Sequence, residues 1–355
     1  MTERDHRYCA LPPQREISLP PDISVQRARA ILQGRTKWVN GTTLRYYFFG
    51  GANDGSPADW RVPDAQAAVV RAAFQSWAAL GIGLHFTEVR DRSEAEIRIG
   101  FDQTDGSWSY VGRDILRAGT NDRTMNFGWD LTADAYGTTT ALHEIGHTIG
   151  LPHEHQNPYS GIVWDEEKVY TYFGGAPNNW PRDVTFQNVL RKLSAAEVTG
   201  SGWDPDSIME YGFPPGLVKE PAKFHATGID PPGTLSEIDR EYVLKWYPAI
   251  GPVTPPVLKP FASSAVTLRP GEQVDHTIRP TETRNYKIGT FGDSDMVLVL
   301  FENVGGRLRK LAADDDSGED RNALIEVKLF QGHDYVVRAR LYYAWNSGNT
   351  SVMYW

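Results

Sequence analysis

The first part of the chain carries the hydrophobic pattern of a mixed α and β domain. Residues 42–49 alternate apolar and polar side chains as a half-buried strand does, and residues 83–89 and 95–101 repeat that pattern. Between them, residues 65–80 place apolar side chains, among them Trp77, at helical spacing. This order of strand, helix and two strands, followed by a second long helix, predicts an α+β domain with a twisted mixed sheet backed by two long helices.

The pattern becomes irregular after residue 153. Asparagine, glycine and proline recur between residues 157 and 181, which predicts a lower subdomain of loops with few helices. A helical run then follows at residues 235–247 and is expected to pack against this lower subdomain.

Five prolines and one glycine within residues 248–260 predict a stiff, extended linker between two domains. Beyond it, short alternating runs separated by Gly and Asp turns predict a small all-β sandwich. These runs are residues 285–290, 296–302, 324–329 and 334–341. The predicted organisation is an N-terminal arm at 1–40 that could act as a pro-segment, with a short helical pattern at 24–32, a catalytic domain at 41–250, a linker at 251–260 and a sandwich at 261–355.

The stretch from His143 to Glu154 predicts a zinc site with its own general base. His143 and His147 lie four residues apart, so on a helix both imidazoles project from one face. Glu144 projects beside such a metal and can take a proton from a zinc-activated water. In an unbroken helix His153 would lie about 15 Å beyond His143, too far to share a metal.

A turn after the helix resolves this conflict. Gly150 readily adopts the left-handed conformation that ends a helix, and Pro152 cannot continue one. We therefore expect the chain to turn back and bring His153 to the metal. The alternative is a structural histidine cluster, but a closed structural zinc site would require a fourth protein ligand.

These residues resemble the metzincin metallopeptidases, and the trailing Glu154 makes the motif similar to the astacin branch. The segment from Ser207 to Tyr211 resembles the family's Met-turn. The resemblance implies that Met209 packs beneath the metal and that Tyr211 ligates zinc at rest and stabilises the reacting carbonyl. For both residues, ordinary core packing is the alternative. By the same resemblance Glu154 would fix a processed N-terminus or neighbouring loops, although a structural salt bridge is equally compatible.

The resemblance also implies a strand that binds substrate. Residues 106–112 resemble a stretch that precedes this strand in astacins, and residues 124–129 are predicted to be the strand itself, at the edge of the sheet. An extended peptide would pair with it by strand addition. The alternative is a plain edge strand.

Cys9 is the single cysteine of the chain, so no internal disulfide can form. It lies in the N-terminal arm, and a thiolate is a good zinc ligand that could fill the open fourth position and displace the catalytic water. This interpretation is similar to the latency of matrix metalloproteinases. A small free thiol in a flexible or packed arm is the alternative.

Charge and hydropathy restrict the partners. The net charge is −9, with no cluster of lysine and arginine, which argues against nucleic acid and favours a peptide or protein substrate. No apolar run reaches the length of a membrane span, and residues 1–13 lack the apolar region of a classical signal peptide. We therefore expect a soluble protein and a monomer, and the family resemblance favours an extracellular location.

The C-terminal domain resembles the pre-peptidase C-terminal domains of bacterial peptidases. Its acidic turn contains Asp314, Asp315, Asp316, Glu319 and Asp320, which could bind calcium, although a solvated hairpin tip explains these residues as well.

An aromatic group near the C-terminus has two interpretations. Tyr342, Tyr343 and Trp345 could form a sugar-binding platform, or they could pack against the catalytic domain.

The predicted activity is that of a zinc-dependent endopeptidase in which Glu144 is the general base. One alternative is a non-catalytic protein that binds its partner through the sandwich; three intact ligands and an intact base argue against it. A zinc hydrolase acting on a non-peptide amide is a further alternative that the motif does not distinguish.

Overall fold

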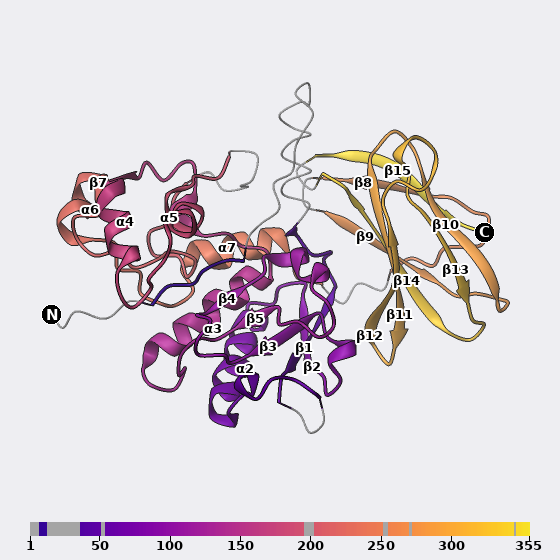
Figure 1. The fold of residues 1–355 in the computed structure, drawn as a ribbon. Coiled ribbons are helices and arrows are strands. Elements are labelled where there is room, and N and C mark those ends of the chain that lie inside the picture. Colours follow the sequence, from indigo (N-terminus) through magenta and orange to yellow (C-terminus); the bar gives the residue numbers. More distant parts are fainter. Residues whose placement is uncertain are drawn as a thin grey trace. The chain divides into compact units, whose positions relative to one another are not determined.

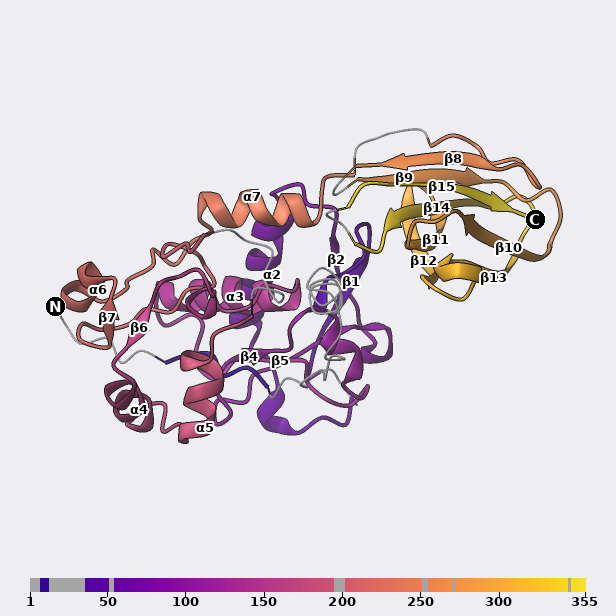
Figure 2. The same cartoon turned by 90° about the horizontal axis from the view of Figure 1, so that it is seen from above.

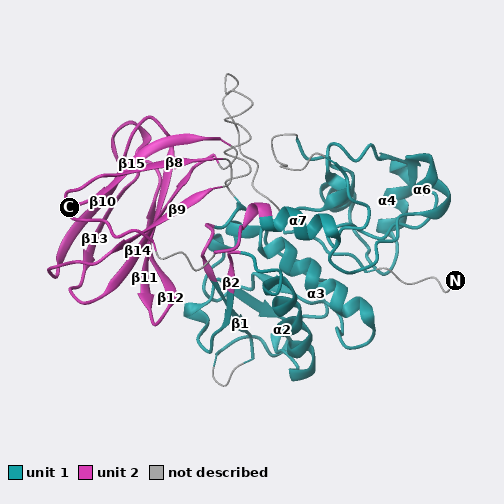
Figure 3. Cartoon of the chain, turned by 180° about the vertical axis from the view of Figure 1, so that it is seen from behind, with its two compact units in different colours: residues 1–38, 44–82, 86–244 teal, residues 39–43, 83–85, 245–355 magenta. Residues whose placement is uncertain are grey.

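The computed structural model forms two compact units (Figures 1 and 3). Unit 1 comprises residues 1–38, 44–82 and 86–244, and unit 2 comprises residues 39–43, 83–85 and 245–355. The residues that the structure describes are 7–12, 36–50, 54–194, 202–250, 255–269, 272–343 and 346–355. The helical pattern predicted at residues 24–32 lies outside them.

Unit 1 contains the predicted mixed sheet. Its strands are β1 (Thr43–Phe48), β2 (His85–Glu88), β3 (Ile97–Gly100), β4 (Trp108–Ser109) and β5 (Met125–Asn126). They are arranged in the order β2-β1-β3-β5-β4. β1 and β5 both run parallel to β3, whereas β4 runs antiparallel to β5. The prediction of a mixed sheet is confirmed.

The prediction that residues 124–129 form the edge of the sheet is wrong. β5 lies between β3 and β4, and residues 124–129 are all buried. The edge strand is β4, which lies within residues 106–112, the stretch predicted only to precede the edge strand. The alternating pattern of residues 124–129 is typical of a central strand as well as of an edge strand. Side chains alternate with the same period whether a strand pairs with one neighbour or with two.

Two long helices back this sheet, as predicted. They are α2 (Asp64–Ala78) and α3 (Ala135–Thr148). The ring of Tyr46 on β1 stacks on Phe74 of α2, with centroids 4.3 Å apart. Trp77 Nε1 then donates to the carbonyl oxygen of Leu142 at 3.0 Å, which ties α2 to α3. The rings of Tyr46, Phe74 and Trp77 are all buried, so the sheet and the two helices share one core.

The lower part of unit 1 is built from short elements that gather at one end of the unit (Figures 1 and 2). Its buried cluster includes Phe173, Tyr211 and Phe213, and it also includes Tyr8 and Cys9 from the N-terminal arm. The arm therefore contributes to the core of this part. The remaining elements before residue 247 are η1 (Ala58–Trp60), η2 (Arg92–Glu94), η3 (Gly112–Arg117), η4 (Glu154–Gln156), β6 (Val163–Trp164), α4 (Glu166–Gly174), α5 (Arg182–Thr185), η5 (Phe186–Leu190), β7 (Val218–Glu220), α6 (Ala222–Thr227) and α7 (Glu237–Trp246).

Unit 2 contains the predicted β-sandwich. One sheet has the order β13-β10-β15-β8 and the other has the order β12-β11-β14-β9, and neighbouring strands are antiparallel. Side chains from both sheets, such as Ile288 and Leu298, share one buried cluster. The elements are β8 (Ser264–Leu268), β9 (Gln273–Ile278), β10 (Arg284–Phe291), β11 (Met296–Val304), β12 (Arg307–Asp314), η6 (Glu319–Arg321), β13 (Leu324–Leu329), β14 (Asp334–Leu341) and β15 (Gly348–Tyr354).

The segment predicted as a linker contributes to this sandwich. Leu258 is buried within the sandwich core, and Val257 forms a bridge to Thr277. The domain boundary at residue 261 stays a prediction.

Arg338 is a fully buried cation in the sandwich. Its Nε and Nη2 donate to the two carboxylate oxygens of Asp275 at 2.7 Å each, and its Nη1 donates to the carbonyl oxygen of Asn40. We expect Asp275→Asn to lower the free energy of unfolding by about 3 kcal/mol, because it leaves a buried charge without its partner. Urea denaturation provides the measurement.

Asp334→Asn is the matched control for this prediction. Asp334 pairs with Arg279 at 3.0 Å, but both side chains are largely in solvent. Removing this exposed pair should cost less than about 1 kcal/mol. Equal losses in the two variants would contradict the role assigned to the buried pair.

Candidate metal centre

Helix α3 presents the first two predicted ligands. Asp134 caps its N-terminus by accepting a hydrogen bond from the backbone of Tyr136 at 2.8 Å. His143 Nδ1 donates to the carbonyl oxygen of Ile208 at 2.8 Å, and His147 Nδ1 donates to that of Leu151 at 2.8 Å. These two bonds fix the tautomers, so each Nε2 keeps its lone pair for a metal.

The chain turns at Gly150 as predicted and brings back His153. Helix α3 ends at Thr148, and Gly150 has a φ of 104°. Leu151 N donates to the carbonyl oxygen of Gly146 at 3.0 Å, which closes the turn. His153 Nε2 then lies 3.1 Å from His147 Nε2.

The three imidazoles fit a zinc ion. His143 Nε2 is buried without a hydrogen-bond partner among the described residues. Burial lowers the pKa of His143 to about 4, and burial together with the neighbouring imidazoles lowers the pKa values of His147 and His153 well below their usual range. Three neutral, buried imidazoles therefore offer lone pairs to one point, as a zinc site requires.

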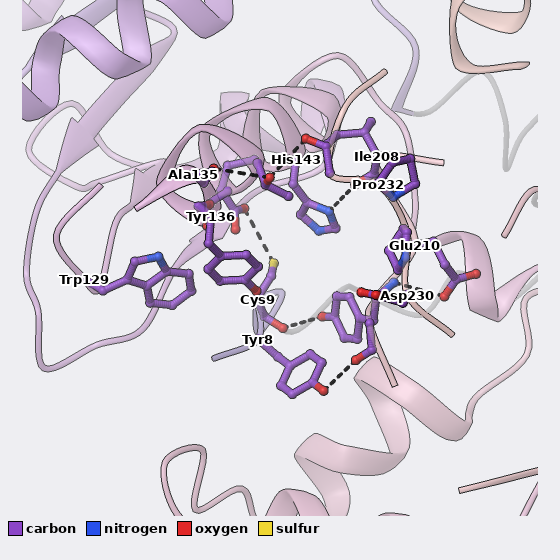
Figure 4. A pocket seen from close by; sticks show the side chains of 17 residues that line it. Tyr8, Cys9, Trp129, Ala135, Tyr136, His143, Ile208, Glu210, Asp230 and Pro232 are labelled. Carbon is purple, nitrogen blue, oxygen red and sulfur yellow. Dashed lines mark hydrogen bonds between the residues drawn. The ribbon is translucent and has the colours of Figure 1, made fainter. Parts of the chain in front are cut away.

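The arm segment, residues 7–12, adds a fourth ligand atom. The Cys9 thiol and the three histidines have ligand atoms that all lie within 4.8 Å of one another. The Cys9 Sγ also lies 3.5 Å from Glu144 Oε2, to which it donates (Figure 4). Burial and the nearby Glu144 carboxylate raise the pKa of the Cys9 thiol. The structure thus brings Cys9 together with the predicted ligands and the predicted base.

Backbone and side-chain contacts hold the arm segment in the cleft. Ala10 N donates to the carbonyl oxygen of Ser107, next to the edge strand β4, at 3.1 Å. From the lower part of unit 1, Asn188 Oδ1 accepts from Leu11 N at 2.9 Å. Figure 4 shows Tyr136 beside the arm, and its hydroxyl donates to the carbonyl oxygen of Arg7. The arm therefore contacts both walls of the cleft.

Glu144 is buried and contacts the Cys9 thiol, which lies among the histidine ligand atoms. Burial raises the pKa of Glu144 to about 8, while the hydrogen bond from Cys9 acts in the opposite direction. Its Oε1 is buried without a hydrogen-bond partner among the described residues. The carboxylate therefore has one oxygen against the thiol and one oxygen available for another donor.

Tyr211 lies beside the three histidines. Its ring centroid is 4.5 Å from that of His153 and 5.9 Å from that of His143. Its hydroxyl donates to the backbone carbonyl oxygen of Cys9. In this arrangement the hydroxyl contacts a peptide carbonyl of the arm at the centre of the site.

The turn that carries Met209 is held by an aspartate that the sequence analysis did not single out. Asp239 Oδ2 accepts from Ile208 N at 2.8 Å, and Asp239 Oδ1 accepts from the Ser207 hydroxyl at 2.7 Å. Asp239 also exchanges hydrogen bonds with Ser236 at the start of α7. The Ser236-x-x-Asp239 spacing is that of a capping box, and this signal could have identified the residue.

Glu154 and His155 directly follow His153, the third predicted ligand. The buried ring of His155 stacks on His153 with centroids 5.2 Å apart, and its Nε2 donates to the carbonyl oxygen of Asn188 at 2.8 Å. Glu154 Oε1 accepts from Asp204 N and from Asn157 Nδ2, each at 3.1 Å. Burial raises the pKa of Glu154 to about 8. Its contacts here are hydrogen bonds to neighbouring loops.

Gly146 allows Met209 to approach α3. A Cβ atom at Gly146 would lie 2.3 Å from Met209 Sδ, and Trp77 closes the same space. We expect Gly146→Ala to displace Met209 and to lower the free energy of unfolding by about 1–3 kcal/mol, with weaker zinc binding. Thermal unfolding and zinc titration measure the two effects. Gly202→Ala is the control because a Cβ there meets no atom within 4 Å, and an equal loss in this variant would contradict the prediction.

A cavity of about 280 Å³ adjoins the site (Figure 4). His143, Glu144, Tyr136 and Ile208 contribute to its walls, and Tyr8 and Cys9 border it from the arm. The arm segment thus borders this space and leaves it open next to the predicted base.

The other predicted sites lie in unit 2. Carboxylate oxygens of Asp314, Asp315 and Asp316 lie within 4.8 Å of one another, but Asp314 already accepts hydrogen bonds from Ser317 and Leu324. Calcium binding there stays a prediction.

The aromatic group is only partly described, because Trp345 lies outside the described residues. Tyr342 packs against a buried cluster of the sandwich, and its ring makes an edge contact with Tyr343 at 5.2 Å. These contacts lie within unit 2, and both the sugar-binding platform and packing against the catalytic domain stay predictions.

Two comparisons bear on the identity of unit 1. The family model of the astacin peptidases matches residues 58–215. The solved structure of myroilysin aligns with this chain at a TM-score of 0.52 and 32% sequence identity, covering 60% of this chain and 96% of myroilysin. The chain belongs to the astacin family.

The part that matches the astacin model contains His143, His147, His153, Glu144 and the Met-turn. Cys9 lies outside the matched residues, so the family match by itself does not describe the arm.

More distant similarities complete the comparison. Serralysin of Photorhabdus laumondii subsp. laumondii is 27% identical over 188 residues, which are 42% of this chain, and the match spans 38% of that serralysin's length. The pre-peptidase C-terminal domain of a collagenase from Bacillus anthracis aligns at a TM-score of 0.26 and 13% identity, covering 30% of this chain and 99% of that domain. Among the described residues of this astacin family member, no helix is long and apolar enough to cross a membrane.

Proposed function

We propose that this chain is a zinc endopeptidase that is held latent by Cys9. The observation that carries the proposal is the convergence of four ligand atoms, three from histidines and one from the arm, within 4.8 Å. Three protein ligands with an open fourth position are typical of catalytic zinc, whereas four closed ligands leave no position for water or substrate. The arm closes a site that is otherwise built for catalysis.

His143, His147 and His153 would hold the zinc ion, which when bound polarises the scissile carbonyl group and acidifies water. Glu144 would take a proton from the attacking water through the carboxylate oxygen that has no partner in the described structure. The same carboxyl group would then pass that proton to the leaving amine. Because Glu144 would carry out both proton transfers, its carboxyl group must lie next to the scissile bond. Cys9 now contacts that carboxyl group.

Tyr211 would donate a hydrogen bond to the scissile carbonyl oxygen. The structure supports this role because the Tyr211 hydroxyl already donates to a peptide carbonyl, that of Cys9, next to the three histidines. A substrate carbonyl in that position would receive the same hydrogen bond. One such donor typically contributes about 3 kcal/mol to stabilisation of the developing oxyanion.

A peptide substrate fits the edge of the sheet. The backbone of the arm segment pairs with Ser107 beside β4, and that edge has no further strand of unit 1 beyond it in the described sheet. An extended substrate could pair with the same edge by strand addition once the arm has left. This use of the edge favours a peptide over a small non-peptide amide.

Latency follows from two blocks that the arm imposes together. Cys9 lies at the position that water or substrate must occupy, and its thiol contacts the base that must activate the water. The arm backbone at the same time occupies the pairing position beside Ser107 and the hydroxyl of Tyr211. Residues 9 and 10 therefore contact the proposed metal site, Glu144, Tyr211 and the edge of the sheet at the same time.

The test compares the full-length chain with a chain whose arm has been removed by limited proteolysis. An unfolded protein substrate is incubated with each form, with and without a zinc chelator. We expect cleavage only after the arm is removed, and we expect the chelator to abolish it. Chelator-sensitive cleavage of a non-peptide amide alone would contradict the endopeptidase, and equal cleavage by both forms would contradict latency.

A further inference from the structure

The side chain of Tyr8 occupies an aromatic pocket beside the catalytic centre. Its ring centroid lies 4.7 Å from that of Phe173, 5.1 Å from that of Tyr211 and 6.2 Å from that of Phe213. Trp180 and Tyr172 close the pocket with edge contacts at 6.4 and 6.2 Å. Only 5% of Tyr8 is exposed, so the pocket surrounds the ring on nearly all sides.

The pocket also matches the polar end of a tyrosine. The Tyr8 hydroxyl donates to the carbonyl oxygen of Gly212 at 2.6 Å and lies 3.2 Å from the Tyr172 hydroxyl. The main chain is recognised as well, because Asn178 Oδ1 accepts from Tyr8 N at 3.2 Å. The pocket therefore recognises the ring, the phenolic hydroxyl and the backbone of a single residue.

The pocket is directly coupled to the groups assigned to catalysis. Tyr211 forms one wall, and Gly212 next to it supplies the hydroxyl acceptor. The residue that follows Tyr8 is Cys9, whose thiol lies among the predicted zinc ligands. A peptide residue in this pocket must therefore lie within about two residues of the atom at the metal, because consecutive Cα atoms are about 3.8 Å apart.

We infer that this pocket, which Tyr8 fills in the latent chain, is a substrate subsite that selects tyrosine within two residues of the scissile bond. The inference rests on the proposed peptidase function. When the arm leaves, the aromatic walls and the Gly212 carbonyl oxygen become available to the next peptide that enters the cleft. An aromatic ring regains the buried contacts, and a phenol also satisfies the carbonyl oxygen, so the subsite prefers tyrosine to phenylalanine and both to alanine.

The chain offers a matched pair of variants on helix α4. Tyr172→Phe removes the hydroxyl that faces Tyr8 and keeps the ring. Tyr170→Phe makes the same chemical change two residues earlier, where the ring faces the guanidinium of Arg182 instead of the pocket. Neither residue belongs to the zinc ligands or to the base.

The experiment uses the full-length chain after removal of its arm. A peptide library is digested and the cleaved bonds are identified by mass spectrometry. Four synthetic peptides that differ only by Tyr, Phe, Leu or Ala at the preferred position are then compared by kcat/KM. We expect about tenfold or greater preference for tyrosine over alanine. We also expect the ratio of tyrosine to phenylalanine to fall in Tyr172→Phe and to stay unchanged in Tyr170→Phe.

The outcomes separate this inference from the proposed function. Robust chelator-sensitive cleavage without aromatic enrichment near the scissile bond would overturn the subsite and leave the peptidase intact. Absence of chelator-sensitive cleavage of every peptide would overturn the peptidase and the subsite together. The third outcome is an aromatic preference in which Tyr172→Phe and Tyr170→Phe give the same ratio of kcat/KM for the tyrosine peptide to kcat/KM for the phenylalanine peptide. This outcome would overturn the role of the Tyr172 hydroxyl.

Discussion

Replacing Cys9 with alanine should make the full-length chain proteolytically active without removal of its arm. Among the described residues of the arm, only the Cys9 thiol lies among the ligand atoms at the centre, and it also contacts Glu144, the proposed base. If zinc–thiolate binding favours the closed arm by about 3 kcal/mol, its loss raises the open fraction on the order of 100-fold. The measurement is the initial rate of cleavage of an unfolded protein by Cys9→Ala and by the unchanged chain.

Arg7→Ala is the matched control for the Cys9 variant. It alters the same arm segment but leaves the thiol in place, and the contact of Arg7 with Tyr136 uses its backbone carbonyl oxygen. Replacing zinc with cobalt adds a spectroscopic check, because a bound thiolate gives a charge-transfer absorption that Cys9→Ala must lose. Equal low activity in the unchanged chain and in Cys9→Ala, with no change in that absorption, would reject the latency.

Replacing Glu144 with glutamine should abolish cleavage while zinc remains bound. In the Cys9→Ala chain, we expect kcat/KM to fall by about 10²- to 10⁴-fold, because an amide cannot accept the proton that a carboxylate takes from water. Zinc content should stay the same, since the three imidazoles supply the ligands. Steady-state kinetics and metal analysis of the same preparations measure both quantities.

Glu154→Gln is the control for this second change. Glu154 is also largely buried beside the site, and burial raises its pKa to about 8 as it does for Glu144. Glutamine keeps the Oε1 acceptor that Asp204 and Asn157 use. A comparable loss of activity in both variants would show that burial of a carboxyl group near the zinc matters more than its contact with the reacting bond.

The spacing of the histidines allowed the centre to be predicted because it is a local property of one helix and one turn. His143 and His147 share a face of α3, and Gly150 has the left-handed conformation that returns His153. Each inference uses residues within about ten positions. The mixed sheet, the two helices and the sandwich were likewise predicted from periodicity within short windows.

The features that sequence reasoning missed depend on contacts between distant segments. Periodicity marks residues 124–129 as a strand but carries no information about which strands flank it, and the structure places β4 at the edge instead. Asp239 reaches the Met-turn from a helix that begins about thirty residues later, and Tyr8 enters a pocket formed by residues more than 160 positions away. Such pairings are set by the packed fold, so a single chain pattern does not reveal them.

The arm segment also connects the sheet to the lower part of unit 1. Ala10 bonds to the sheet beside β4, whereas Leu11 and Tyr8 bond to Asn188 and Gly212 of the lower part. Tyr8 and Cys9 belong to the buried cluster of that lower part, so removal of the arm, as proposed for activation, would lower the free energy of unfolding by roughly a few kcal/mol. Under the proposed latency, the chain with its arm would therefore be the more stable form, and removal of the arm would open the cleft at the cost of stability. Such an enzyme would be most stable in its latent form, and it would become more susceptible to degradation once it is activated.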